Sequence, residues 1–238
     1  MDKFHEHSSG VADVSEFVRH LPCPECGSSD ANSLYSDGHE FCFVCRRRTN
    51  GDGETTIHLQ QNRMQLIGTA EGIPKRKLSQ RTTEKFKTYR DGDVLRHYYY
   101  DEDGSIVGAK VRTRDKTFTS EGTVRTLFGM QNFRKKTTKK GESKLVITEG
   151  EMDAMSVWEA QPGWDVVSVP TGAAGAKKAI QNNYEWVTGY DKIILFFDND
   201  EAGQKAAKDC AGVLPPSKTF IGVLADYKDA SEALAAND

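Results

Sequence analysis

The chain has 238 residues, enough for one large domain or two small ones, and a formal net charge of −3. No apolar run approaches the length of about 18 residues that a membrane span needs. The polar N-terminus lacks the basic start and apolar stretch of a secretory signal. These features exclude a membrane protein and predict an intracellular one.

The small net charge hides a strong internal asymmetry. Residues 1–72 carry 6 Lys and Arg against 11 Asp and Glu, and residues 145–238 carry 7 against 15. Residues 73–144 between them carry 19 against 9, a balance of +10. A basic segment between two acidic ones predicts a polyanion held near carboxylates that bind metal.

The N-terminal part contains a four-cysteine pattern. Residues 11–21 have a weak helical spacing and lead into two CxxC pairs separated by fifteen residues, a spacing typical of a zinc site. One structural Zn²⁺ accepts four thiolates in a tetrahedron. Two short strands are expected on either side of Asp37-Gly38, as in a zinc ribbon. The predicted zinc ligands are Cys23, Cys26, Cys42 and Cys45.

A four-thiolate zinc site folds a module but does no chemistry itself, so recognition must come from the module's surface. The candidates for contact with nucleic acid are Asp37, His39 and the run Arg46-Arg47-Arg48. A structural role for His39 and a solvated charged face for the arginines stay open as alternatives.

The basic middle begins after a polar linker, residues 51–72. A short helix is expected over 79–88 with Ser79 as its cap, followed by a hairpin whose strands flank the turn at 101–104. Tyrosines 98–100 in this hairpin are expected to supply at least one packed side chain.

The second strand of the hairpin carries a candidate anion site. Alternation along the strand places Lys110, Arg112 and Lys116 on one face. Because three cations on one face repel one another, an anion is expected there.

From residue 144 apolar strands alternate with helices. This pattern indicates βα units and a Rossmann-like parallel sheet covered on both faces, and the chain is therefore predicted to be an α/β protein. The expected strands are 144–148, 165–171, 192–197 and 218–225, and the expected helices are 151–160, 173–187, 201–214 and 229–236.

Acidic side chains follow several of these strands. Glu149 follows the first strand, Asp198 and Asp200 follow the third, and Asp229 follows the fourth. The carboxyl ends of parallel strands share one edge of a sheet, so these side chains are expected to converge there. Such a cluster suits one or two Mg²⁺ ions. Glu151 and Asp153 are interpreted instead as acids of a first helical turn, which favour the positive end of the helix dipole, with a place in the cluster as the alternative.

These motifs resemble a known family. Val146-Ile147-Thr148-Glu149-Gly150 and the DxDxxG run 198–203 resemble the Toprim domain of primases and topoisomerases, and residues 228–232 resemble its third acidic motif. With a four-Cys ribbon in front, the chain is similar to DnaG-type DNA primases. It resembles most the primase half of the bifunctional primase–helicases of short-tailed phages.

The resemblance implies a nucleotidyltransferase that makes short RNA primers on single-stranded DNA from ribonucleoside triphosphates. Its partners would be the template, the RNA product, a replicative helicase and a DNA polymerase, in the cytoplasm of the infected bacterial host. It implies that Glu149, Asp198, Asp200 and Asp229 bind Mg²⁺, and that Glu149, Asp198, Asp200 and Lys116 are catalytic. It also implies that Lys110, Arg112 and Lys116 bind nucleotide, and that Asp37 and His39 read the template. Arg46 and Arg47, from the basic run beside the zinc ribbon, are predicted to contact the template as well.

The predicted domains are the zinc ribbon at 1–50, ordered from about residue 14, the linker at 51–72, a basic α+β subdomain at 73–143 and the Toprim subdomain at 144–238. The sequence contains no GxxxxGK[ST] phosphate loop, so unwinding is not assigned to these residues. A zinc and Toprim recombination mediator without polymerase activity and a Toprim nuclease are the alternatives.

Overall fold

The structure is a computed structural model that describes residues 15–51, 64–101, 104–115, 117–133 and 143–236. It divides the chain into two compact units, Met1–Asn62 and Arg63–Asp238. We call them the ribbon unit and the catalytic-core unit, and each is described by itself.

The ribbon unit is a four-stranded antiparallel sheet with the strands in chain order. The strands are β1 (Phe17–Leu21), β2 (Asn32–Tyr35), β3 (Glu40–Cys42) and β4 (Arg48–Thr49). The strands expected around Asp37-Gly38 are confirmed as β2 and β3. The weak helical spacing before the first cysteine was misleading, because residues 17–21 pair with β2 as a strand.

Gly51, the last described residue of the ribbon unit, lies against the β2–β3 turn of the same unit. Gly38 lies in this turn with φ +82°, a left-handed conformation that glycine adopts without strain. A Cβ atom on Gly51 would lie 2.0 Å from the carbonyl oxygen of Asp37, so only glycine fits at this point.

The catalytic-core unit begins with an antiparallel sheet. Its elements are η1 (Pro74–Arg76), α1 (Gln80–Lys85), β5 (Thr88–Asp91), β6 (Val94–Tyr100), β7 (Ile106–Arg112), β8 (Phe118–Gly122) and η2 (Met130–Asn132). The Ser79 side chain accepts a hydrogen bond from the Thr82 N–H, which confirms the expected cap of α1. The expected hairpin is the antiparallel pair β6 and β7, in which Tyr98 and Tyr99 are fully buried.

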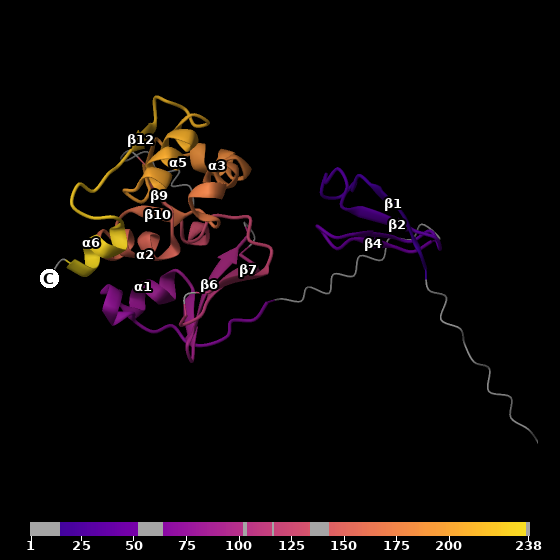
Figure 1. Ribbon diagram of the computed structural model, residues 1–238, viewed down its shortest axis with the longest axis horizontal. Coiled ribbons are helices and arrows are strands. Elements are labelled where there is room, and N and C mark those ends of the chain that lie inside the picture. The colour runs from indigo at the N-terminus through magenta and orange to yellow at the C-terminus, as the bar shows by residue number, and fades with distance from the viewer. Residues whose placement is uncertain (1–14, 52–63, 102–103, 116, 134–142, 237–238) are drawn as a thin grey trace, which may run out of the picture. The chain divides into compact units, whose positions relative to one another are not determined.

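The second sheet is parallel, with the strand order β10-β9-β11-β12. Helices α2 and α6 lie on one side of it and α3 and α5 on the other (Figure 1). The elements are β9 (Lys144–Thr148), α2 (Glu151–Ala160), β10 (Asp165–Ser168), α3 (Gly172–Asn182), α4 (Tyr184–Thr188), β11 (Lys192–Phe196), α5 (Glu201–Ala211), β12 (Thr219–Ile221) and α6 (Ala230–Ala236). The predicted α/β class and parallel sheet are confirmed.

Two elements differ from expectation. The helix expected over 173–187 divides at Asn183, whose side chain donates a hydrogen bond to the Ala179 carbonyl and ends α3. The fourth strand is short and lies at the edge of the sheet. Phe220 in it is 47% exposed, so β12 is not a buried strand.

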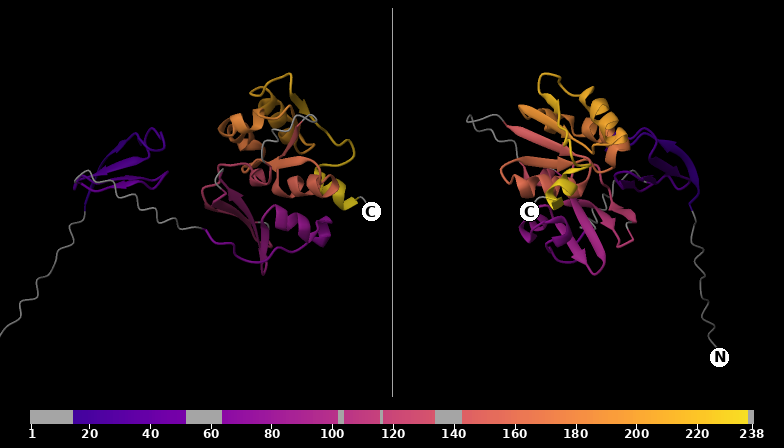
Figure 2. Two further views of the ribbon diagram at one scale, coloured as in Figure 1. Left: turned by 180° about the vertical axis from the view of Figure 1, so that it is seen from behind. Right: turned by 60° about the vertical axis from the view of Figure 1, so that its left-hand side comes forward.

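The two sheets share one hydrophobic core. The Phe86 ring lies between Phe128, Phe133 and Trp158, which come from both halves of the unit. Phe128 also forms an isolated antiparallel bridge with Ser168 of β10. Figure 2 shows the two sheets from two further sides. A boundary between residues 143 and 144 therefore stays a prediction about subdomains within one compact unit.

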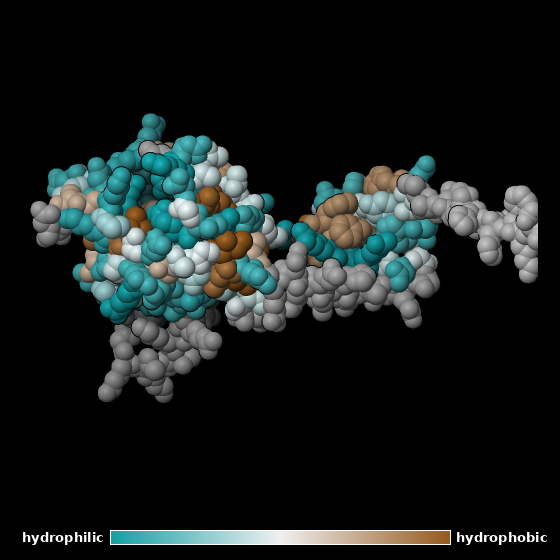
Figure 3. All heavy atoms as spheres, turned by 90° about the horizontal axis from the view of Figure 1, so that it is seen from below, coloured by the Kyte–Doolittle hydropathy of each residue, from teal (hydrophilic) through white to brown (hydrophobic). Residues whose placement is uncertain are grey.

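The catalytic-core face drawn in Figure 3 is mostly hydrophilic, with hydrophobic residues gathered in small patches. Within the described residues, no helix combines the length and apolar character that crossing a bilayer requires.

Candidate active site and zinc site

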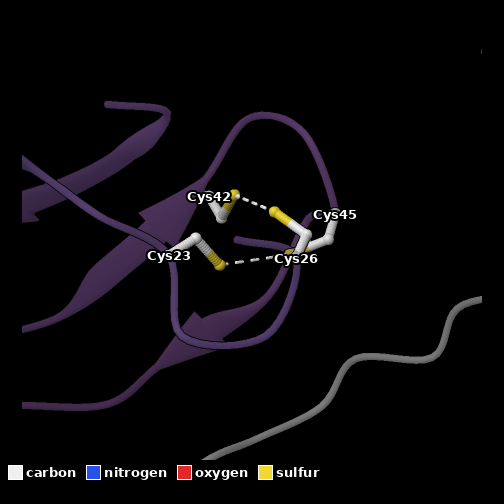
Figure 4. A group of neighbouring side chains, drawn as sticks. All are labelled: Cys23, Cys26, Cys42 and Cys45. Carbon is white, nitrogen blue, oxygen red and sulfur yellow. Dashed lines mark hydrogen bonds between the residues drawn. The ribbon is translucent and has the colours of Figure 1, made fainter. Parts of the chain in front are cut away.

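The four cysteines of the ribbon unit face one point (Figure 4). Their sulfur atoms all lie within 4.8 Å of one another, with Cys23 3.6 Å from Cys45 and Cys26 3.7 Å from Cys42. Four Zn–S bonds of about 2.3 Å in a tetrahedron imply sulfur separations of about 3.8 Å. The cluster therefore fits one structural zinc ion.

The thiols also have the electrostatics of a metal site. Burial disfavours ionisation of Cys23, yet backbone N–H groups of Cys26 and Glu25 and the neighbouring thiols lower its pKa to about 6. Burial, together with the other thiols of the cluster, raises the pKa of Cys45 to about 12. A bound cation relieves this conflict, because it stabilises all four thiolates together.

Two of the predicted template-reading residues touch each other beside the β2–β3 turn. His39 Nδ1 lies 2.6 Å from Asp37 Oδ1, and the His39 N–H donates to the same oxygen at 3.1 Å. The His39 ring stacks on Tyr35, with centroids 4.3 Å apart and planes 6° apart. The carboxylate and the stacked ring fix the orientation of the imidazole.

The arginine run that follows Cys45 is divided by its contacts. Arg47 pairs with Glu40 of β3 at 3.4 Å, whereas Arg46 and Arg48 are exposed. Of the predicted pair, Arg46 thus presents its charge to solvent, while Arg47 is engaged within the sheet.

The positions of the acidic residues in the catalytic-core unit are set by the parallel sheet. β9 and β11 are neighbouring parallel strands whose last residues, Thr148 and Phe196, are in register. Glu149 therefore leaves the sheet at the same edge as Asp198. A backbone hydrogen bond of 2.6 Å from the Asn199 N–H to the Lys228 carbonyl brings in the loop before α6.

Glu149 is held at one oxygen only. Its Oε1 accepts a hydrogen bond of 3.2 Å from the Ala173 N–H at the start of α3. Its Oε2 is buried and has no hydrogen-bond partner among the described residues. A buried carboxylate oxygen without a donor is costly unless a cation reaches it.

Asp198 and Asp200 have opposite electrostatics. Burial and then the charges of Glu149 and Asp229 raise the pKa of Asp198 to about 6. The Gly203 N–H donates to Asp200 at 2.9 Å, and this bond helps to lower the pKa of Asp200 while it caps α5. The raised pKa of Asp198 is consistent with acidic loops that lie close enough for their charges to interact.

Asp153 joins this cluster from the first turn of α2. Burial, with the charge of Asp229 next, raises its pKa to about 7. The Ser231 N–H donates to Asp153 at 3.0 Å, and Asp229 itself caps α6 by accepting from the Glu232 N–H at 2.7 Å. Asp153, Asp198, Lys228 and Asp229 line one narrow pocket.

A lysine lies among these carboxylates. Lys228 Nζ is 3.2 Å from Asp200 and 3.6 Å from Asp198. In the part of the chain that the structure describes, no three acidic side chains hold oxygens that all lie within 4.8 Å of one another. The carboxylates of this cluster are therefore not gathered tightly around a single point.

The predicted cationic strand lies in the same unit. Lys110 and Arg112 of β7 both approach the ring of Phe118, at 5.6 and 5.5 Å from its centroid, so they share a face. Lys116 lies outside the described residues. The anion expected beside these cations is in part a side chain of the protein, because Lys110 Nζ lies 2.8 Å from Glu151.

Both units match known protein families. Residues 18–54 match the family described as the zinc-binding domain of primase-helicase, and residues 146–234 match the family described as Toprim-like. The crystal structure of the primase fragment of the bacteriophage T7 primase-helicase protein is 37% identical. The match covers 92% of this chain and 94% of that one, with a TM-score of 0.65.

The chain belongs to the phage primase family.

This family also includes a longer relative. The DNA helicase/primase of Enterobacteria phage T3 is 39% identical in an alignment 242 residues long that covers 92% of this chain. The chain spans 42% of the length of that relative. A further T7 structure, of a DNA polymerase with primase domains of two subunits, an RNA/DNA hybrid and dTTP, is 38% identical, has a TM-score of 0.63 and covers 70% of this chain and 85% of that one.

For this member of the phage primase family, the sequence interpretation missed two features of the acidic cluster. Asp153 was interpreted as a helix-dipole acid, although its place in the first turn of the helix after the first strand could have indicated the same edge of the sheet as Glu149. Lys228 was part of a motif but had no proposed contact, and no periodicity in the sequence places its ammonium beside Asp198 and Asp200.

Proposed function

We propose that the chain is a DNA-templated primase that synthesises short RNA primers from ribonucleoside triphosphates on single-stranded DNA. The observation that carries this proposal is the match of both units to one T7 primase fragment over 94% of its length. The juxtaposed carboxylates and the adjacent basic strand β7 support the same chemistry.

The acidic cluster would hold one or two Mg²⁺ ions, with Glu149, Asp198, Asp200 and Asp229 as ligands. When bound, Mg²⁺ would lower the barrier to attack on the α-phosphate by offsetting negative charge at the reacting oxygens. The free Oε2 of Glu149 and the raised pKa of Asp198 support this assignment, because both mark an acidic site that lacks sufficient positive charge.

The basic strand would hold the triphosphate. Lys110 and Arg112 would neutralise phosphate oxygens, and Lys116, although outside the described residues, is assigned the same role with a catalytic contribution. The exposed ring of Phe118 lies beside both described cations and offers a stacking face for a base.

The ribbon unit would select the start site on the template. Asp37 and His39 present a fixed hydrogen-bonding pair, and Arg46 offers an exposed cation for a phosphate. Arg47 would contact DNA only if it left Glu40, so Arg46 is expected to contribute more.

The partners follow from the relatives. The T3 protein is named as both helicase and primase, and the T7 complex contains a DNA polymerase. We therefore assign a replicative helicase and a DNA polymerase as partners, and the cytoplasm of the infected bacterium as the place of action.

The function is tested by mixing the protein with single-stranded DNA of varied sequence, labelled ribonucleotides and Mg²⁺. Short RNA products that depend on the template sequence are expected. Cleavage of the DNA would instead indicate a Toprim nuclease, and binding without products would indicate a recombination mediator.

A further inference from the structure

A buried carboxylate that the proposed metal site does not use joins the two sheets of the catalytic-core unit. Glu151, the first residue of α2, is 5% exposed. Its Oε1 lies 2.8 Å from Lys110 Nζ of β7 and accepts a hydrogen bond of 2.5 Å from the Tyr99 hydroxyl of β6. One carboxylate oxygen thus receives donors from two strands of the antiparallel sheet.

The surroundings of this ion pair include one neutral histidine and a second, more distant cation, Arg112 of β7. Tyr99 is fully buried, and His97, also buried, bonds to Thr88 at 2.9 Å. Burial, the largest cause, lowers the pKa of His97 to about 4, so its imidazole is neutral at physiological pH. The cation in direct contact with Glu151 is the ammonium of Lys110, while Arg112 acts on Glu151 electrostatically without a recorded ion pair.

Stability alone is a poor reason for such a pair. A buried ion pair is often no more stabilising than an apolar contact of the same volume, because both charges lose their hydration. What an ion pair adds is a defined position for the two charged groups. Lys110 keeps further N–H donors after its bond to Glu151, because an ammonium has three.

The Glu151–Lys110 pair lies close in sequence to the acidic cluster. Glu149, whose Oε2 is free, and Glu151 are separated only by Gly150, the cap residue of α2. A short segment of backbone therefore carries a proposed metal ligand at one end and the anchor of a proposed phosphate-binding lysine at the other.

We propose that Glu151 is a positioning residue that fixes the ammonium of Lys110 beside the metal-binding loop, so that the triphosphate and the metal ligands are held in register. This inference rests on the proposed primase function. Glu151 acts through Lys110 and contacts no reacting atom itself.

The test is a double-mutant cycle in the priming assay with Glu151→Gln, Lys110→Met and the double variant. The amide keeps the shape and an acceptor oxygen but removes the charge that holds the ammonium. We expect Glu151→Gln to raise KM for ribonucleotides by about tenfold with a smaller change in kcat. In the Lys110→Met background the same change should have less than about a twofold effect.

A matched control lies on the same helix. Glu159 of α2 also bridges the two halves, since it accepts hydrogen bonds from the Ser79 N–H and hydroxyl at 2.9 Å, but it does not contact Lys110. Glu159→Gln should change the melting temperature, and any effect on KM should be the same with and without Lys110→Met.

A second readout is equilibrium dialysis of ATP against the same variants, in which Glu151→Gln should weaken binding and Glu159→Gln should not. Equal effects of Glu151→Gln in the presence and absence of the Lys110 side chain would overturn the positioning role. If the unmodified protein made no template-dependent RNA, the proposed function itself would fail, and the two failures are therefore distinguishable.

Discussion

The ammonium of Lys228 lies 3.2 Å from a carboxylate oxygen of Asp200, within the acidic cluster of the catalytic-core unit. The same nitrogen is 3.6 Å from Asp198. The ammonium of Lys228 thus occupies a position beside the oxygens that we assign to Mg²⁺.

Lys228→Met should therefore tighten the binding of a divalent cation. The lysine competes for the same oxygens, so its removal is expected to lower the dissociation constant for Mn²⁺ by roughly threefold or more. Titration calorimetry with Mn²⁺ measures this directly. Lys205→Met is the control, because the recorded ion pair of Lys205, among the described residues, is with Asp209 on α5, at 3.3 Å. Unchanged affinity in Lys228→Met would show that the lysine does not compete.

Asp198→Asn should abolish primer synthesis and leave the fold and the zinc content unchanged. The amide keeps the volume of the side chain but removes a charge that a metal ion needs. Circular dichroism and zinc analysis establish that the variant is folded, and the priming assay measures the loss. Retained synthesis would remove Asp198 from the proposed metal site.

The stabilising effect of Mg²⁺ should grow as pH rises. The folded protein raises the pKa of Asp198 to about 6 and that of Asp153 to about 7, from an ordinary value of 3.8. Between about pH 4 and pH 7 the folded state holds protons that the unfolded chain has released. The free energy of unfolding of the metal-free protein therefore falls as pH rises through this range.

A divalent cation binds the ionised form, so the rise in melting temperature on adding Mg²⁺ should be larger at about pH 8 than at about pH 5. Asp153→Asn keeps an oxygen for the Ser231 N–H and should flatten the loss of stability in the metal-free protein. A Mg²⁺ effect that is independent of pH would contradict this account.

Cys42→Ser should release zinc and unfold the ribbon unit alone. The two units are separately compact, so the thermal transition of the catalytic-core unit should be unchanged. Initiation at a defined template sequence should be lost, while residual template-independent dinucleotide synthesis persists. Sequence-specific initiation that survives zinc loss would exclude the ribbon as the template reader.

Gly203→Ala should destabilise the catalytic-core unit by about 1–3 kcal/mol, because overpacking forces the backbone to shift. A Cβ there would lie 2.3 Å from the Asp198 carbonyl oxygen. Gly212→Ala is the control, since its nearest neighbour would be at 3.6 Å and its φ is −65°. Denaturant unfolding measures the free energy of unfolding of both variants. Equal values would show that the loop at Asp198 can move to accommodate the added methyl group.

The local patterns of the sequence were sufficient for most elements. The two CxxC pairs predicted a zinc ribbon, and the alternation after residue 144 predicted the parallel sheet whose order places β9 beside β11. Periodicity failed where the neighbours decide the structure. β12 is exposed because it is an edge strand, and Asn183 ends α3 through a side-chain hydrogen bond that helix propensity does not encode.

The candidate site was predictable only where the topology of the parallel sheet fixes the positions of its residues. Motif spacing indicated Glu149 and Asp198, because residues that follow parallel strands share an edge. The contact of Lys110 with Glu151 joins positions 41 residues apart in different sheets, so no local pattern contains it. The roles assigned to these side chains stay predictions until the variants above are measured.

The close approach of Gly51 to the Asp37 carbonyl has a steric consequence for the loop that carries Asp37 and His39. A side chain at position 51 would push against that carbonyl. The conformation of the loop therefore depends on a glycine that follows it in the chain, and not only on the hydrogen bonds between Asp37 and His39.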